Sequence, residues 1–152
     1  MTERPELEEL SPDILASYRV AHLEMIQGVI DRMAGYCAAL KNFCVTIVAA
    51  LLAVGLDKGQ GMKPLVVVGF IILFGVLDAY YLGLERRYRA HFNEVRKRPL
   101  SRAPEFDMAA PPSYFSTYIS SVGSISVGPF YVLLLTLAAT VLFLYRHGVH
   151  PS

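Results

Sequence analysis

The sequence predicts an all-α integral membrane protein in which a long N-terminal amphipathic cytoplasmic helix continues into the first of three transmembrane helices. Two observations carry this prediction. Hydrophobic residues make up 54% of the 152-residue chain and charged residues only 18%, which is far from the composition of an average soluble domain. The apolar residues also gather into three runs that reach or approach the length needed to cross a bilayer. We expect these helices to form an oligomeric bundle.

Residues 1–40 are predicted to form the cytoplasmic amphipathic helical region. Ser11 and Pro12 are typical of a helix start, as a cap and a first-turn proline. Beyond them, apolar and aromatic side chains recur at three- and four-residue spacing, which predicts an amphipathic helix with a heptad-like seam. The seam residues are Leu15, Tyr18, His22, Met25, Ile26, Val29, Met33, Tyr36 and Leu40.

Residues 41–85 are predicted to form a transmembrane hairpin. No Gly-Pro break separates the amphipathic helix from the apolar stretch Phe43–Leu56, so we expect one continuous helix, with the Lys41 ammonium reaching the interface. A short Gly-rich turn then leads to a second apolar run, Pro64–Leu84. About 20 residues cross a bilayer, and both runs reach that length when the first is counted from Tyr36.

Three further segments complete the predicted organisation. Residues 86–112 form a basic and then Pro-rich loop, residues 113–128 an interfacial segment, and residues 129–145 a third transmembrane helix. The loop carries seven Lys or Arg residues near a membrane end, whereas the turn between the first two spans carries two. By the positive-inside rule, the N-terminus and the 86–112 loop are expected in the cytoplasm.

Asp78 lies within the second predicted span, where a lone carboxylate is costly and faces a protein interior or water. One interpretation is structural: Asp78 bonds Tyr80 or Tyr81 of a neighbouring helix, or pairs with an arginine. A second is functional: Asp78 lines a pore or a proton path, and Asp78, Tyr81 and Glu85 form the pore lining or gate. A third is a shallow, solvated placement. Glu85 is also spaced to pair with Arg89 at i,i+4.

The basic run after this span admits two interpretations. Charge alone would hold it to anionic membrane lipid as a stop-transfer cluster. Alternatively it binds a nucleotide or oligonucleotide, because guanidinium groups suit phosphate and the interleaved Tyr88, His91 and Phe92 are able to stack on bases. The predicted ligand-binding residues are Arg86, Arg87, Arg89, Arg96 and Arg98.

No enzymatic activity is predicted. The sequence has no phosphate-binding Gly loop, no HExxH motif, no metal-ligand spacing of Cys or His and no nucleophile elbow, so we expect no catalytic residue, metal or cofactor. Arg86 with His91 resembles the short RNase motif of HEPN domains, but such a pair arises easily by chance in an Arg-rich run. Cys37 and Cys44 are too far apart on one helix to bond and are interpreted as packing residues.

The stretch LDAYYLGLERRYRAHFNEVR resembles small bacterial membrane proteins that accompany nucleotide-signalling immunity, of the SLATT-type effector and Hailong channel-subunit kinds. The resemblance covers about residues 41–95. It implies a channel in the bacterial inner membrane that depolarises the cell when a nucleotide, an oligonucleotide or a partner releases or triggers it. It also implies that Asp78 belongs to the gate, and that three arginines belong to the ligand-sensing side: Arg86, Arg87 and Arg89.

The predicted spans need partners. Three spans in a chain of this size are too few to enclose a wide aqueous path, and both the polar group in a span and the long seam call for further contacts. A homo-oligomer satisfies them together. We therefore expect an oligomeric gated ion channel or pore-forming effector of an anti-phage defence system. The alternative is a non-conducting membrane scaffold or accessory subunit that recruits a cytoplasmic enzyme.

Overall fold

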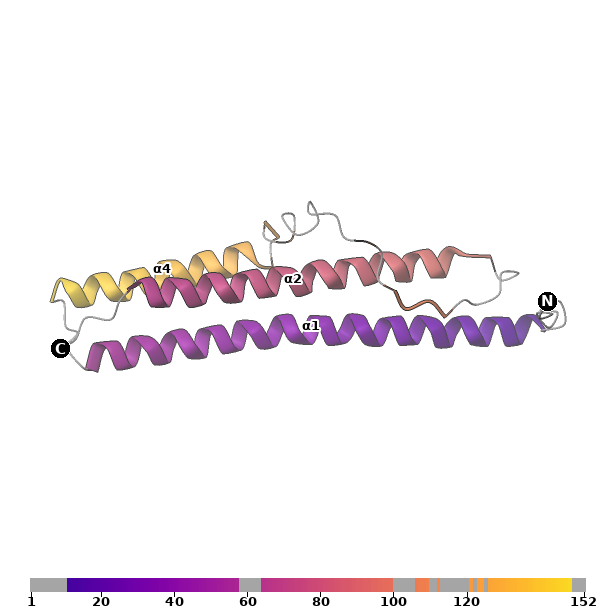
Figure 1. Cartoon of the computed structure of the whole chain (residues 1–152), viewed down its shortest axis with the longest axis horizontal. Coiled ribbons are helices and arrows are strands. Elements are labelled where there is room, and N and C mark those ends of the chain that lie inside the picture. Colours follow the sequence, from indigo (N-terminus) through magenta and orange to yellow (C-terminus); the bar gives the residue numbers. More distant parts are fainter. Residues whose placement is uncertain are drawn as a thin grey trace, which may run out of the picture. The chain divides into compact units, whose positions relative to one another are not determined.

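The computed structural model describes residues 11–57, 64–99, 106–109, 112, 121, 123–124 and 126–148. Three helices make up most of this part of the chain: α1 (Pro12–Asp57), α2 (Pro64–Lys97) and α4 (Gly128–Arg146) (Figure 1). All three are long and apolar enough to cross a membrane, which indicates a membrane location. The prediction of an all-α chain with three helices able to span a membrane is therefore confirmed.

Proline marks the start of each helix. Pro12 and Pro64 are the first residues of α1 and α2, and Pro129 is the second residue of α4. At these positions the fixed φ angle suits a helix and the missing N–H costs nothing, because the first turn has no intrahelical acceptor for it. Ser11 adds a cap to α1, since its Oγ accepts from the Ile14 N–H at 3.4 Å.

Helices α1 and α2 are longer than a bilayer requires. Their 46 and 34 residues correspond to about 69 Å and about 51 Å at the helical rise, against about 30 Å for a hydrocarbon core. As predicted, α1 is one uninterrupted helix. Because α2 continues to Lys97, the basic first part of the predicted 86–112 loop is helical. The predicted turn between the first two spans and most of the 113–128 segment lie outside the described residues.

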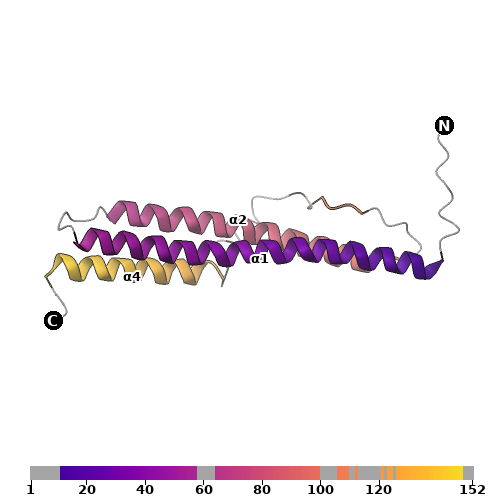
Figure 2. The same ribbon diagram turned by 90° about the horizontal axis from the view of Figure 1, so that it is seen from below.

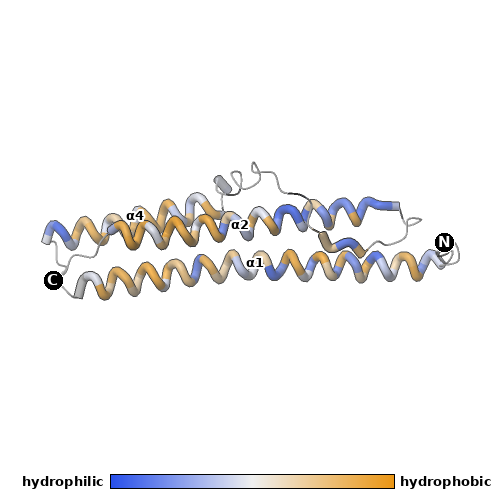
Figure 3. The backbone as a smooth tube through the Cα atoms, viewed as in Figure 1, coloured by the Kyte–Doolittle hydropathy of each residue, from blue (hydrophilic) through white to orange (hydrophobic). Residues whose placement is uncertain are grey.

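The chain divides into two compact units. The apolar unit comprises Ala34–Gly83 and Tyr114–Ser152, and the charged unit comprises Met1–Met33 and Leu84–Ser113. Within the apolar unit, α1, α2 and α4 lie side by side (Figures 1 and 2). Figure 3 shows that the first half of α2 and most of α4 are hydrophobic, whereas the second half of α2 is largely hydrophilic.

The core of the apolar unit draws on all three helices. Its surface is also apolar, since Phe43, Leu65 and Leu133 have exposed fractions of 62%, 82% and 69%. A three-helix unit that is apolar both inside and outside suits a lipid environment better than water. The buried core residues are Cys44, Val48, Val67, Ile71, Ala79, Val127, Tyr131, Leu134 and Ala138.

The charged unit has its own smaller core. Ile26, Ile30 and Val95 are buried there, and the Arg19 guanidinium closes the end of α2 by donating to the carbonyls of Arg98 and Pro99. The predicted seam of α1 is correct at His22 and Ile26, which are buried. It is too broad elsewhere, because three of its members are exposed by 42%, 45% and 48%: Tyr18, Met25 and Tyr36.

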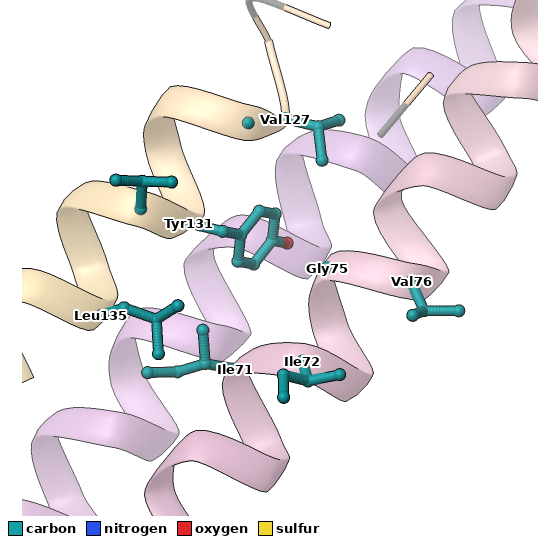
Figure 4. Close-up of a pocket in the computed structure, with 9 residues that line it drawn as sticks. Ile71, Ile72, Gly75, Val76, Val127, Tyr131 and Leu135 are labelled. Atoms are coloured by element: carbon teal, nitrogen blue, oxygen red, sulfur yellow. The ribbon is translucent and has the colours of Figure 1, made fainter. Parts of the chain in front are cut away.

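Tyr131 joins α4 to α2 inside the apolar unit. Its hydroxyl donates to the Phe74 carbonyl at 3.2 Å, and its ring covers Gly75, where a Cβ atom would lie 3.6 Å from the nearest ring carbon. Figure 4 shows the ring reaching from α4 toward α2, beside an apolar groove whose lining includes Ile71 and Leu135. The space at residue 75 thus admits a side chain no larger than a methyl group between these two helices.

We expect Gly75→Leu to lower the free energy of unfolding by about 1–3 kcal/mol, because a side chain larger than a methyl group must displace the Tyr131 ring. Gly75→Ala should be tolerated, since its methyl group would make an ordinary contact. Thermal unfolding in detergent micelles, followed by circular dichroism, measures both. Gly69→Leu is the control, because nothing lies within 4 Å of a Cβ there. Equal losses in Gly75→Leu and Gly69→Leu would contradict this packing.

Candidate functional site

An ion pair joins α1 to α2 within the apolar unit. The Lys41 Nζ atom lies 2.6 Å from Asp78 Oδ2. The Asp78 side chain is completely buried, and the Lys41 side chain is 20% exposed. Charged side chains are rarely buried this far unless they are paired, so each of these residues explains the position of the other.

Counted along α2, the pair lies well inside the part of the helix that is able to cross a membrane. Asp78 is fourteen residues beyond Pro64, the first residue of α2, which corresponds to about 21 Å at the helical rise. A hydrocarbon core is about 30 Å thick. If α2 enters the membrane near Pro64, the carboxylate lies roughly 9 Å short of the opposite boundary. An ionised pair at that depth requires the protein itself to replace its hydration.

Side chains from α1 and α4 surround the pair. The Lys41 ammonium lies 5.9 Å from the centre of the Phe130 ring on α4, a distance at which a cation is attracted to an aromatic face. The Cys37 thiol donates to the Asp78 carbonyl oxygen at 3.8 Å. The Tyr131 hydroxyl donates to the Phe74 carbonyl and also lies close enough to the Asp78 carboxylate to interact with it. The carboxylate is thus enclosed by protein, and the ammonium is largely covered.

The Asp78 carboxylate retains unused bonding capacity. The Lys41 ammonium lies at ion-pair distance from Oδ2, the Tyr131 hydroxyl of α4 lies nearby, and within the described ranges no donor meets Oδ1 in full hydrogen-bond geometry. A carboxylate has about four lone-pair positions, and most buried polar groups fill theirs. Asp78 is therefore able to accept a proton, a water molecule or a cation in addition to its ion pair.

Sequence reasoning identified Asp78 but missed its partner. Within the chain, Asp78 bonds neither Tyr80 nor Tyr81, because Tyr80 is exposed and Tyr81 packs against Tyr36 with 5.2 Å between ring centres. Lys41, expected to extend toward the interface, instead turns to Asp78. The spacing in the sequence did contain a signal for this pairing. Lys41 follows Cys37 by four residues and precedes Cys44 by three, so it shares the helix face of two thiols that are buried toward α2.

The predicted gate residues have separate surroundings. Tyr81 lies in an aromatic cluster with Tyr36 and Tyr80 in the apolar unit. Glu85 belongs to the charged unit, where its buried carboxylate accepts from the Arg89 guanidinium at 2.8 Å. The predicted i,i+4 pair between Glu85 and Arg89 is confirmed. Asp78, Glu85 and Tyr81 thus lie on one helix, but each has its own partners.

The five predicted ligand-binding arginines do not share one face of α2. At 100° per residue, Arg86, Arg89 and Arg96 fall on one side of the helix and Arg87 falls on the other, whereas Arg98 lies just beyond the last residue of α2. Arg89 is paired with Glu85. Arg98 is likewise paired, with Glu94 at 2.7 Å. One phosphate group is therefore within reach of two or three of these arginines and not of all five.

The aromatic residues between the arginines are occupied by packing. His91 is buried, and its Nε2 atom lies 2.8 Å from the Asp107 carbonyl oxygen. Tyr88 and Phe92 pack against the core of the charged unit. Of the predicted ligand-binding arginines, Arg89 lines a small pocket of about 240 Å³, together with Gln27, Ile30, Phe92 and Asn93. This volume is below the usual range for a nucleotide-sized ligand, about 300–1,000 Å³.

Comparisons with protein-family models, with curated protein sequences and with solved structures found no match to this chain. The function is therefore inferred from the residues of the chain itself. The enclosed Lys41–Asp78 pair is the feature that most requires a functional explanation.

We expect either single substitution of the pair, Lys41→Met or Asp78→Leu, to lower the free energy of unfolding by about 3–5 kcal/mol. Each leaves one charge enclosed without its partner. The double variant should recover most of that loss, because an apolar pair of similar volume has no charge to desolvate. Unfolding in detergent micelles, analysed as a double-mutant cycle, measures the coupling. Additive losses in the double variant would refute the ion pair.

Proposed function

We propose that this chain is the subunit of a homo-oligomeric gated ion channel, whose closed state is held by the Lys41–Asp78 ion pair. The observation that carries the proposal is the fully buried Asp78 carboxylate inside a helix able to span a membrane. Ionisable residues in that setting are costly and by default mark ion pathways or proton relays.

Stability alone does not explain why the chain contains such a buried ion pair. Replacing a buried ion pair by well-packed apolar residues is often neutral or stabilising, since the charges must first be removed from water. Apolar packing already holds the three helices of the apolar unit together around the pair. A charged pair retained in that setting is better explained by the chemistry of its carboxylate, which still has unused acceptor positions.

Opening would consist of separating the carboxylate from the ammonium. While Lys41 covers Asp78, the two charges nearly cancel and the carboxylate attracts no other cation. Once the two part, an oligomer with cyclic symmetry would present one Asp78 carboxylate per subunit around its axis. Rings of acidic side chains are a common basis for cation selectivity. Three helices per chain are too few for a wide aqueous path, so the pore is formed between subunits.

Control would come through the charged end of α2. This helix is continuous from Asp78 to the Glu85–Arg89 pair and on to Lys97. A ligand or partner that moves the second half of α2 therefore also moves the residue that carries the carboxylate. A phosphate group of a nucleotide or oligonucleotide would bind on the face that carries Arg86, Arg89 and Arg96. In a bacterial defence system, such opening would depolarise the inner membrane.

We expect purified protein in liposomes to release a potassium gradient several times faster than wild type when Lys41→Met breaks the pair and leaves the carboxylate in place. Asp78→Asn and the double variant Lys41→Met/Asp78→Leu should both release it more slowly than Lys41→Met, because neither has a carboxylate to attract cations. A potential-sensitive dye measures each rate, and circular dichroism confirms that each variant is folded. Glu24→Gln, an exposed carboxylate on α1, is the matched control.

The channel proposal would be contradicted if the wild type and all variants are folded and inserted and yet retain the gradient. The chain would then be better described as a membrane scaffold. The exposed apolar residues of α1 in the charged unit favour that alternative, since Val20 and Met25 are 54% and 45% exposed. Expression in cells separates the two functions, because only a channel dissipates the membrane potential.

A further inference from the structure

A short segment after α2, Phe106–Ala109, lies against both helices of the charged unit and is called the docked segment below. Its central carbonyl, that of Asp107, meets two histidine side chains. His22 Nε2 from α1 lies 3.0 Å from this oxygen, and His91 Nε2 from α2 lies 2.8 Å from it. A carbonyl oxygen only accepts, so both imidazoles donate to it from Nε2.

The two side chains that flank this carbonyl make specific contacts. The Phe106 ring lies 5.5 Å from the His22 ring and 6.1 Å from the Tyr18 ring, between ring centres. The Met108 side chain packs against the buried cluster of the charged unit, and its carbonyl accepts from the Tyr88 hydroxyl at 3.4 Å. A thioether fills irregular apolar gaps well. Phe106 remains 41% exposed, so the docked segment is held by one half-buried aromatic anchor, one thioether anchor and backbone carbonyls.

The groove that holds the docked segment presents two hydrogen-bond donors at its centre. With the docked segment in place, His22 and His91 are 2% and 3% exposed. Under this cover the Asp107 carbonyl is the acceptor that both N–H groups meet, as buried donors require. The groove therefore places two donors where one acceptor of a peptide backbone satisfies both.

The docked segment also carries features of a ligand with its own conformation. Phe106 has a φ angle of 44°, in the left-handed region that a residue with a Cβ atom rarely adopts. The Asp107 carboxylate accepts from the Ala109 N–H at 2.8 Å and closes a local turn. Such a conformation persists where surrounding contacts select it, and here these contacts come from α1 and α2.

We propose that this groove is a recognition site for a peptide segment of a partner protein, and that the docked segment occupies it in cis. The partner's segment would carry an aromatic residue, a turn-forming Asp and a Met or similar apolar residue, in the order found in Phe106–Asp107–Met108. Backbone hydrogen bonds provide affinity in such sites, and side-chain anchors provide specificity. Binding of the partner displaces the docked segment, so the chain inhibits its own groove. This site does not depend on ion conduction.

The test uses the full chain in lipid nanodiscs and a fluorescent synthetic peptide, PEFDMAA, which reproduces residues 104–110. The double variant Phe106→Ala/Met108→Ala removes both anchors of the docked segment and leaves the groove intact. It should bind the peptide about 10- to 100-fold more tightly than wild type, the factor expected if the groove is free only about 1–10% of the time in the wild type. Met25→Ala, an exposed methionine of α1, is the matched control and should bind as wild type does.

Two further measurements keep the result independent of any one variant. Adding His91→Phe to the double variant keeps an aromatic ring but removes a donor, and it should weaken peptide binding at least tenfold. In unaltered wild type, saturating peptide should raise hydrogen exchange at the amides of the docked segment, and the peptide PEADMAA should not. The proposal is overturned if folded double variant fails to bind the peptide, if a scrambled peptide binds equally well, or if exchange in the docked segment stays unchanged.

Discussion

The Lys41–Asp78 ion pair is the constraint on which the apolar unit depends. It contains a completely buried carboxylate and an ammonium from two different helices, so the register of α1 against α2 is correct only when these two groups meet. A shift of either helix by one turn would place each charge in apolar surroundings without its counterion, at a cost that apolar packing does not offset. The third helix adds the Phe130 ring to the same enclosure.

The charged unit is held by a different kind of contact, although the same two helices build it. Among its described residues few apolar side chains are buried, and much of its specificity comes from His22 and His91 on a single backbone carbonyl. Arg19 holds the end of α2 through two more carbonyls. Backbone acceptors thus hold one unit, and an ion pair within apolar packing holds the other.

Hydropathy and proline positions were sufficient to predict the helices. The third predicted helix, residues 129–145, corresponds to α4 at Gly128–Arg146. A long apolar run that begins with a proline strongly favours a helix that starts there. Sequence periodicity does not show which residues of the facing helix lie opposite a given side chain. It assigned Lys41 to the interface, since a lysine near the end of an apolar run usually extends toward water. Only the approach of α2 makes Asp78 a better partner than water.

The candidate site was predictable in part for the same reason. Asp78 stood out as an isolated carboxylate, and the pairing of Glu85 with Arg89 followed from helical spacing alone. The role of His91 did not follow, because its acceptor belongs to a segment sixteen residues further along the chain. The docked segment has no periodic pattern, so its contacts with α1 and α2 were not apparent from the sequence.

The most direct test of this account is the ionisation state of Asp78 in a lipid bilayer. Infrared difference spectra of protein labelled with isotopic aspartate, compared with Asp78→Asn, isolate the band of this one carboxyl group. The ion pair predicts the band of an ionised carboxylate in the wild type, and the frequency of this band should shift when Lys41→Met removes the counterion. A protonated Asp78 in the wild type, or a band unaffected by Lys41→Met, would contradict the ion pair and the channel gate built on it.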